Sequence, residues 1–317
     1  MSARVTARWI DDGVLRSDGL DALPAGLAGP LWIDVFDPDE ETFAAIGARV
    51  PLPPLAVEDC LHSPQRPKLD SYHDLTFVVW LLPQLSGDGG LVTQEIGLFM
   101  TESHLVTVHR LDLPALSRVI DRADVVLARG VEWTVHAILD AAVDEIFPVV
   151  ELLSDELEEI EDLVLAEARP EYLQRLYGIR RSLVALHRVV NPQSDVVRGL
   201  ARLEVFVEPD AYMYFDDIGD HLARLDDTID IYRDVAGGVM DLFVSVQSNR
   251  MNGIMKQLTV VATIFMPLTL ISGIYGMNVI EGMWPPAHAG WSFGLIIVGM
   301  MFIAAWMALF FRRNDWW

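Results

Sequence analysis

The stretch that decides the fold is residues 252–278, NGIMKQLTVVATIFMPLTLISGIYGMN. Within it, the 19 residues from Leu258 to Gly276 carry no charge, and three threonines and one serine are the polar side chains beside the amphipathic Tyr275. A bilayer core of about 30 Å requires roughly 20 such residues in a helix. A second run, Trp291 to Phe311, has 21 residues with no charge and one serine. The two runs predict transmembrane helices at 258–276 and 291–311.

Charges beside these runs predict how the chain crosses the membrane. Arg250 and Lys256 precede the first run, and Arg312 and Arg313 follow the second. The loop between the runs, 277–290, contains no lysine or arginine. Because positively charged residues remain on the cytoplasmic side, we expect an inner (plasma) membrane protein with both termini and the tail 312–317 in the cytoplasm. The loop 277–290 is then the outer loop.

Composition limits the partners and the chemistry. The formal net charge of −23 argues against nucleic acid and anionic lipid as partners and favours cations. The one cysteine, Cys60, excludes a disulfide framework and a thiolate metal cage within one chain. The chain has no phosphate-binding loop, no paired zinc-hydrolase histidines and no nucleophile motif, so we expect no enzyme.

Residues 1–130 predict a cytoplasmic α/β domain. Short β-branched or aromatic runs at 31–35, 75–81, 95–100 and 104–109 are bounded by turn residues, as strands are. The run Asp-Pro-Asp-Glu-Glu at 37–41 predicts a helix with Asp37 as the capping residue and acids in its first turn.

Residues 131–207 predict a cytoplasmic helical hairpin. Leu153, Leu157, Ile160 and Val164 recur at helical spacing within a segment rich in Asp and Glu. After Arg169-Pro170 the following segment carries several arginines. An acidic helix is therefore expected to turn back on a basic one. The acidic face has two interpretations, a solvated surface and a binding site for divalent cations, of which the solvated surface is favoured.

Residues 208–276 predict one long stalk helix that continues into the first transmembrane helix. Apolar residues alternate at spacings of four and three from Ile218 to Val246, a heptad pattern typical of helices packed side by side. No proline occurs between Asp210 and Met266. At about 1.5 Å per residue the helix would be roughly 100 Å long.

Two membrane helices cannot enclose a path for water, so a pore would require several copies of the chain. The first transmembrane helix is the better lining, because polar and small residues recur along one of its faces. These candidate pore-lining residues are Asn252, Met255, Leu258, Ala262, Met266, Thr269 and Gly273. Such a face also suits plain helix packing in a membrane, which is the alternative interpretation.

Several motifs together resemble one known family. Residues 275–278 read Tyr-Gly-Met-Asn and follow Ala-Thr-Ile-Phe-Met-Pro-Leu-Thr at 262–269. Glu58-Asp59 precedes Gln-Arg-Pro-Lys at 65–68, and the tail 312–317 is basic and aromatic. In these features the chain resembles the CorA family of magnesium and cobalt channels, over most of its length. The Gly-Met-Asn motif is specific because it lies between two terminal membrane spans.

The resemblance implies a funnel-shaped homopentamer in the lipid bilayer, with five long helices forming the stalk and the pore. It implies that Gly276, Met277 and Asn278 form the selectivity filter, and that Met266 and Leu258 form apolar collars that stop ions by dewetting. A ring of amide oxygens suits Mg²⁺, which prefers oxygen ligands and loses its water reluctantly. We expect the backbone to turn sharply at Gly276.

The resemblance also implies regulation by the transported ion. Divalent cations held between neighbouring cytoplasmic domains would keep the pore closed, and the matching residues are Asp59, Glu58 beside it, and Asp217, with Asp216 and Asp220 nearby. A pentamer would carry −115 formal charges, five times −23. Loss of bound Mg²⁺ would restore the repulsion between subunits. High internal Mg²⁺ would thereby close its own entry route.

The outer loop departs from the family pattern. Glu281 is the acidic residue left there to attract cations, and His288 adds a ligand for Zn²⁺, Co²⁺ or Ni²⁺. One alternative is therefore a proton-coupled zinc transporter of the same fold, as in the related ZntB branch. The intact motif at 276–278 favours Mg²⁺. A second alternative, of another class, is a non-conducting membrane scaffold or divalent-cation sensor.

Overall fold

The computed structural model of the chain describes residues 3–24, 27, 29–86, 90–203, 209–277, 284–286, 290–314 and 316. The chain divides into two compact units. The first consists of Met1–Leu163 and Arg169–Met240, and the second of Val164–Ala168 and Asp241–Trp317.

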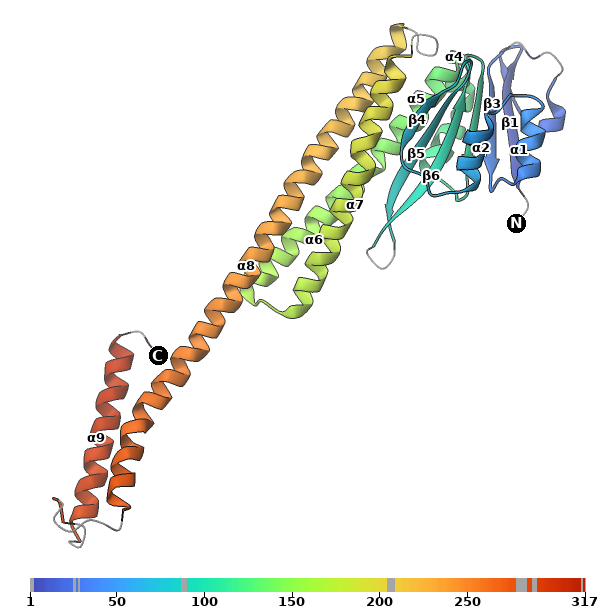
Figure 1. The fold of residues 1–317 in the computed structure, drawn as a ribbon. Coiled ribbons are helices and arrows are strands. Elements are labelled where there is room, and N and C mark those ends of the chain that lie inside the picture. The colour runs from blue at the N-terminus through green and yellow to red at the C-terminus, as the bar shows by residue number, and fades with distance from the viewer. Residues whose placement is uncertain are drawn as a thin grey trace. The chain divides into compact units, whose positions relative to one another are not determined.

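A seven-stranded sheet forms the centre of the first unit (Figure 1), with the strand order β2-β1-β3-β7-β6-β5-β4. Strands β3 and β7 pair in parallel, and the other neighbouring strands pair antiparallel. The strands are β1 (Arg4–Asp11), β2 (Val14–Asp18), β3 (Leu31–Phe36), β4 (Lys68–Ser71), β5 (Thr76–Leu85), β6 (Leu91–Met100) and β7 (His104–His109). The four strands predicted at 31–35, 75–81, 95–100 and 104–109 are confirmed as β3, β5, β6 and β7. Strands β1, β2 and β4 were not predicted.

Two short helices, α1 (Glu40–Gly47) and α2 (Pro54–Leu61), cover one face of the sheet. Alternate residues of the strands, such as Ile33, Val79 and Val106, are fully buried beneath them. Helix α1 begins two residues later than expected, because Asp39 rather than Asp37 accepts the hydrogen bond from the Thr42 amide. A short 3₁₀ helix, Leu20–Ala22, lies between β2 and β3.

Helices from the following part of the chain lie on the opposite face. They are α3 (Pro114–Ile120), α4 (Ala123–Arg129), α5 (Val131–Asp144) and α7 (Pro170–Ala201). Gln193 of α7 is fully buried, and its Nε2 donates a hydrogen bond to the Leu81 carbonyl of β5 at 2.6 Å. Residues 131–163 and 169–203 therefore belong to the same compact unit as the sheet, since α5 and α7 complete its core, whereas residues 164–168 belong to the second unit.

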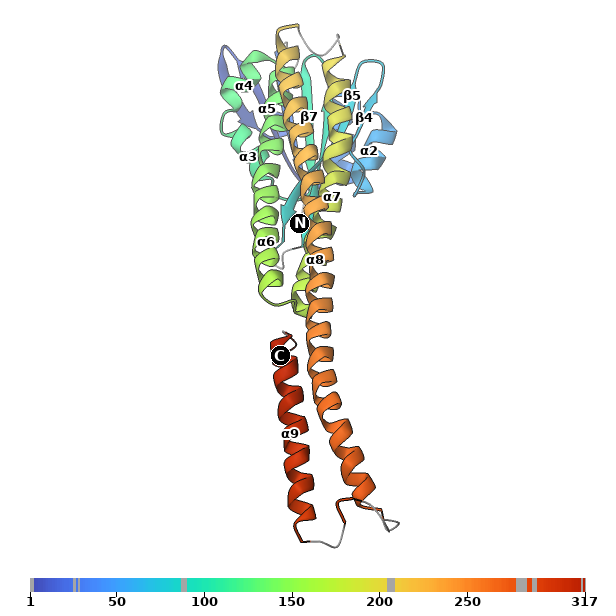
Figure 2. The same cartoon turned by 90° about the vertical axis from the view of Figure 1, so that its left-hand side faces the viewer.

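Three long helices, α6 (Ile146–Ala166), α7 and α8 (Pro209–Tyr275), lie side by side in the first unit (Figure 2). The expected hairpin of acidic α6 and basic α7 is present, and Arg175 of α7 contacts Glu156 and Glu159 of α6 at 3.3 and 2.8 Å. His187 of α7 contacts Asp226 of α8 at 2.8 Å.

The apolar seam of α8 is buried within the chain itself. Ile218, Leu222, Leu225 and Ile229 are at most 1% exposed. The stripe of apolar residues predicted from Leu153 to Val164 lies on helix α6 and is buried. In the first unit the heptad pattern thus reflects packing of α8 on its own chain.

The second unit contains the C-terminal part of α8 and helix α9 (Ser292–Arg313), which lie side by side (Figures 1 and 2). Both helices are long and apolar enough to cross a membrane, with mean hydropathies of 1.9 and 2.4 over their most apolar windows. Only 6% and 0% of these windows is buried within the chain, so they differ from the core helices of soluble proteins. The α/β domain, the long helix and two C-terminal spans agree with the predicted fold class.

Candidate ion pathway and cation-binding site

The seven candidate pore-lining residues of α8 are all exposed in the single chain. Leu258 is 68% exposed and Met266 is 71% exposed. Less exposed residues recur at the intervening positions, and these are Val260, Thr263, Ile264, Pro267, Leu268, Ile271 and Ile274. Because α9 is the neighbouring helix here, it covers one side of α8 and leaves the candidate face open.

Two threonine hydroxyl groups in this part of α8 donate hydrogen bonds to the helix backbone. Thr269 donates to the Phe265 carbonyl at 2.9 Å, and Thr259 donates to the Met255 carbonyl at 2.8 Å. A hydroxyl oxygen that donates still has lone pairs, so Thr269 can accept hydrogen bonds from the water shell of a cation. Leu258 and Met266 on the same face offer no polar group. On this face, apolar positions run from Met255 to Met266, and the hydrogen-bonding side chains are Asn252 before them and Thr269 after them.

Helix α8 ends at Tyr275, immediately before the Gly-Met-Asn motif. The Gly276 amide donates to the Ser272 carbonyl at 3.0 Å, and a Cβ atom at Gly276 would lie only 3.2 Å from that oxygen. The close approach of this carbonyl, rather than a left-handed backbone, is what favours glycine here. Met277 is 58% exposed. Asn278 and Glu281, the other residues predicted to act at the outer mouth, lie outside the described residues.

A hydrogen bond connects the end of α8 to Trp284, which follows the Gly-Met-Asn motif in the chain. The Tyr275 hydroxyl donates to the Trp284 carbonyl at 3.2 Å. On the other side, the Ser292 hydroxyl at the start of α9 donates to the Pro286 carbonyl at 2.7 Å. Residues 284–286 are thus hydrogen-bonded to the end of α8 and to the start of α9.

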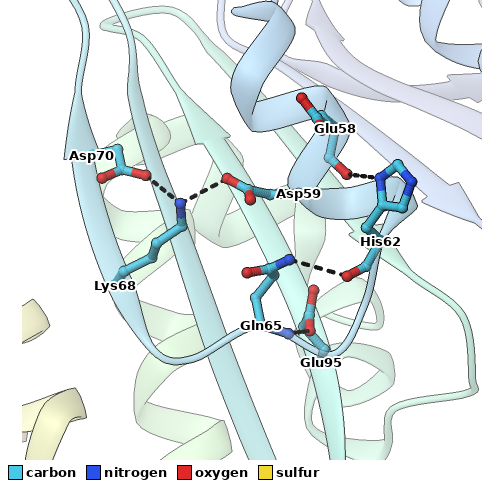
Figure 3. Close-up of polar contacts among 7 residues, drawn as sticks. All are labelled: Glu58, Asp59, His62, Gln65, Lys68, Asp70 and Glu95. Atoms are coloured by element: carbon cyan, nitrogen blue, oxygen red, sulfur yellow. Dashed lines mark hydrogen bonds and ion pairs between the residues drawn. The ribbon is translucent and has the colours of Figure 1, made fainter.

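Helix α2 carries Glu58 and Asp59, the candidate regulatory residues (Figure 3). It lies close to β6, because a Cβ atom at Gly97 would be 2.9 Å from the Cys60 sulfur. Burial raises the pKa of the Cys60 thiol, so this cysteine is kept as an unreactive thiol. Arg110 donates to the Cys60 and Leu61 carbonyls at 3.2 Å and holds the C-terminus of α2.

Lys68 forms two ion pairs beside α2. Its Nζ lies 2.6 Å from Oδ2 of Asp59 and 2.6 Å from Oδ2 of Asp70 (Figure 3). Burial alone would lower the pKa of Lys68, but the hydrogen bonds to Asp59 and Asp70 outweigh it and raise the pKa. The three side chains line an open hollow of about 590 Å³ together with Leu55, Glu58, Leu69, Ser71 and Tyr72.

Lys68 belongs to the Gln-Arg-Pro-Lys motif at 65–68, but the sequence predicted no role for it and none for Asp70. A signal was present in their spacing. Residues two apart on a strand point to the same side, so Lys68 and Asp70 of β4 are side by side. The contact with Asp59 could not be read in this way, because it depends on where α2 packs.

Asp217, the third candidate regulatory residue, lies in a different neighbourhood. Its side chain is 66% exposed on α8, with Nε2 of His221 3.9 Å away. Helix α2 covers one face of the sheet, whereas α8 packs beyond the helices on the other face. The structure therefore does not bring Asp217 to Asp59 within one chain.

A nearby carboxyl group shows how crowded this acidic region is. Burial raises the pKa of Asp140 on α5, and the charges of Asp144 and Asp217 raise it further, against the opposing effect of His136 and His221. The Asp217 region is thus an acidic environment that a cation would stabilise.

The carboxylates fit the chemistry of a regulatory Mg²⁺ ion but not its full coordination. Carboxylate oxygens are ligands that Mg²⁺ accepts, usually one or two of them with retained water. In the described part of the chain, no group of three or more His, Cys, Asp or Glu side chains is placed to hold a metal ion. Water or groups from outside this chain would complete the coordination of such an ion.

Comparison with protein families gives a match over most of the chain. Residues 28–313 match the family model described as CorA-like Mg²⁺ transporter protein. The cobalt/magnesium transport protein CorA of Thermotoga maritima is 30% identical over 296 residues, which cover 90% of this chain and 83% of that protein.

A solved structure and a more distant relative extend the comparison. The complete structure of the CorA magnesium transporter from Methanocaldococcus jannaschii is similar with a TM-score of 0.87 and 26% identity, covering 100% of both chains. The zinc transport protein ZntB of Photorhabdus laumondii is 28% identical over 186 residues, 58% of this chain and 55% of that protein.

Proposed function

Because the chain belongs to the CorA-like family of divalent cation transporters, we propose that it is a channel that admits Mg²⁺ into the cytoplasm. Co²⁺ and Ni²⁺ would pass by the same route. The observation that carries the proposal is the open face of α8, with all seven candidate residues exposed on the side that α9 does not cover. A face that is polar in part and uncovered in one chain suits the axis of an oligomer.

The proposed pathway has a filter and two barriers. Asn278, with Gly276 and Met277, would hold the hydrated ion at the outer mouth through its water shell, and Glu281 would raise the local cation concentration. Leu258 and Met266 would form apolar collars that empty of water when the pore narrows. Between Met266 and the filter, Thr269 would accept hydrogen bonds from the ion's water.

The proposed assembly is a homopentamer with both termini in the cytoplasm. Two membrane helices per chain cannot enclose a pore, so copies must share one axis. Asp59 on α2 and Asp217 on α8 lie far apart in one chain, which supports sites formed between neighbouring copies. Mg²⁺ bound there, with Glu58 beside Asp59, would neutralise repulsion between chains that each carry a net charge of −23 and would favour the closed state.

A second candidate function rests on the similarity to the ZntB protein. That protein is named for zinc transport, and this chain has His288 in its outer loop. A proton-coupled Zn²⁺ transporter of the same fold is therefore the alternative. The two functions differ in the ion and in whether a proton gradient is needed.

The test measures ion uptake into liposomes that contain purified protein and a Mg²⁺-sensitive dye. We expect Mg²⁺ uptake by the native protein along its gradient, and loss of at least about tenfold in rate for Asn278→Ala, since one unfavourable step of about 1.4 kcal/mol has that effect. Asn314→Ala at the end of α9 is the matched control and should retain uptake. Reconstitution must be equal for all three proteins.

Two outcomes would contradict the proposal. Undiminished Mg²⁺ uptake by Asn278→Ala would exclude this residue as the filter. Uptake of Zn²⁺ that requires a proton gradient, without a Mg²⁺ signal, would identify the zinc transporter instead.

A further inference from the structure

The contact between Lys68, Asp59 and Asp70 has a consequence for regulation. One ammonium group lies 2.6 Å from an oxygen of each carboxylate, so the two oxygens are close enough to share a single cation (Figure 3). Asp59 is also the residue that a regulatory divalent cation would use. The ammonium group of Lys68 is therefore already paired with the Asp59 carboxylate.

We propose that Lys68 is a tethered competitor of the regulatory divalent cation, and that Asp70 receives the ammonium group when Asp59 is released. The inference rests on the proposed regulatory role of Asp59. In the cation-free state Lys68 bridges Asp59 and Asp70. In the cation-bound state Asp59 binds the divalent ion, and Lys68 pairs with Asp70 alone.

Charge and geometry support this exchange. Lys68 and a divalent cation cannot both occupy the same side of Asp59, because two positive charges a few ångströms apart repel each other strongly in a partly buried site. The side chains of Lys68 and Asp59 are 33% and 25% exposed, so solvent screens the pair only in part. The hollow of about 590 Å³ around them is open, which gives an ion and its water access.

The strand and the flexible side chain provide the means of exchange. Lys68 and Asp70 lie two residues apart on β4, so their pairing needs no change in the backbone. A lysine ammonium is a compact charge on a flexible four-carbon chain and can rotate from one carboxylate to the other. Its position over the Phe77 ring, 5.7 Å from the ring centre, is compatible with either partner. The strength of this tether would set the Mg²⁺ concentration at which the protein responds.

The experiment titrates Mg²⁺ against the full chain in detergent and follows the rise in unfolding temperature, a readout that is independent of transport. Lys68→Met removes the charge and keeps the apolar stem, and we expect its half-maximal Mg²⁺ concentration to fall about tenfold. Lys68→Arg keeps the charge and should not show that fall. Arg180→Met on α7 changes the net charge equally, away from the hollow, and should respond as the native protein does.

Asp70→Asn provides the second arm. It removes the residue that receives the ammonium, so Lys68 stays on Asp59 and the half-maximal Mg²⁺ concentration rises. In the double variant Lys68→Met with Asp70→Asn, the half-maximal Mg²⁺ concentration should equal that of Lys68→Met alone. A rise caused by Asp70→Asn in both backgrounds would mean that Asp70 acts on the cation directly and would overturn the exchange.

Further outcomes separate this inference from the proposed function. An unchanged response in Lys68→Met, or an equal fall in Lys68→Arg, overturns the tether while Asp59 remains a regulatory residue. If Asp59→Asn leaves the Mg²⁺ response intact, the regulatory site and the tether both fail. Conduction is judged independently, by uptake in the Asn278→Ala protein.

Discussion

Asp34 and His109 form a buried ion pair on the face of the sheet opposite α1 and α2, since they alternate with the residues buried beneath those helices. Nε2 of His109 lies 3.2 Å from Oδ1 of Asp34, and the two side chains are 6% and 13% exposed. Thr107 donates to the same carboxylate oxygen at 2.6 Å. Burial alone would raise the pKa of Asp34, but His109 and the hydrogen bond from Thr107 outweigh it and lower the pKa. Burial alone would lower the pKa of His109, but Asp34 and the Leu111 carbonyl outweigh it and raise the pKa.

These shifts define the pH range in which the pair stabilises the fold. The contribution of His109 is fully present below its unfolded pKa of 6.5 and is lost as pH rises through its higher folded pKa. The contribution of Asp34 is present above its unfolded pKa of 3.8 and is lost as pH falls through its lower folded pKa. We expect Asp34→Asn to lower the free energy of unfolding by about 3 kcal/mol at pH 6, because it leaves a buried charge unpaired.

The measurement is thermal unfolding of the full chain in detergent between pH 5 and pH 9. The deficit of Asp34→Asn relative to the native protein should shrink as His109 loses its proton. Asp74→Asn, at a side chain that is 90% exposed, is the matched control. An equal deficit at pH 6 and pH 9 would show that packing, rather than the charge pair, stabilises this site.

At the scale of elements, one side chain connects helix α7 to the sheet. Gln193 is fully buried and donates to the Leu81 carbonyl, which lies in β5 beyond the last residue that β4 pairs with. Replacing it by methionine keeps the volume but leaves that carbonyl without this partner. A buried group that loses its hydrogen bond costs about 1–3 kcal/mol.

We therefore expect Gln193→Met to lower the unfolding temperature by about 2–8 °C, as a loss of this size does in a domain of this size. Arg188→Met, exposed on the same helix, should change it by less than about 2 °C. Differential scanning fluorimetry in detergent measures both. Unchanged stability in Gln193→Met would mean that water or a local shift satisfies the Leu81 carbonyl.

The sequence predicted best those elements whose evidence is local. The spans follow from uncharged runs of sufficient length, and the long helix α8 follows from its heptads. Strands β1, β2 and β4 were missed: β1 carries charged residues among its apolar ones, and β4 has four residues, so their own residue patterns do not identify them although each pairs with a neighbouring strand in the chain. The same limit applies to the site, because the Lys68–Asp59 contact depends on how α2 packs. The assignments to Asn278 and Glu281 remain predictions.

At the scale of the whole molecule, the dominant property is negative charge. Each 35.4 kDa chain carries a formal net charge of −23, so any oligomer works against its own repulsion. Salt weakens this repulsion by screening, with a Debye length of about 10 Å at 0.1 M. A bound divalent cation removes charge at one site instead. Screening by salt and site binding of a divalent cation can be distinguished by the concentration of each ion that is needed to produce the effect.

We expect the oligomer to dissociate more readily in 0.05 M than in 0.5 M choline chloride when Mg²⁺ is absent, and millimolar Mg²⁺ to restore it at low salt. Light scattering during dilution of the detergent-solubilised protein measures the mass. Asp59→Asn should reduce the Mg²⁺ effect and leave the effect of choline chloride unchanged. If Mg²⁺ acts only as strongly as choline chloride of the same ionic strength, its effect is screening and no site is involved.

The buried seam of α8 also bears on how the protein is made. This part of α8 contacts α5 through His136 and Phe215, α6 through Phe147 and His221, and α7 through His187 and Asp226. All three of these helices precede α8 in the chain. A ribosome would therefore have finished them before this part of α8 emerges, and domains generally fold in that order during synthesis. The seam can be covered at once, without waiting for another copy of the chain.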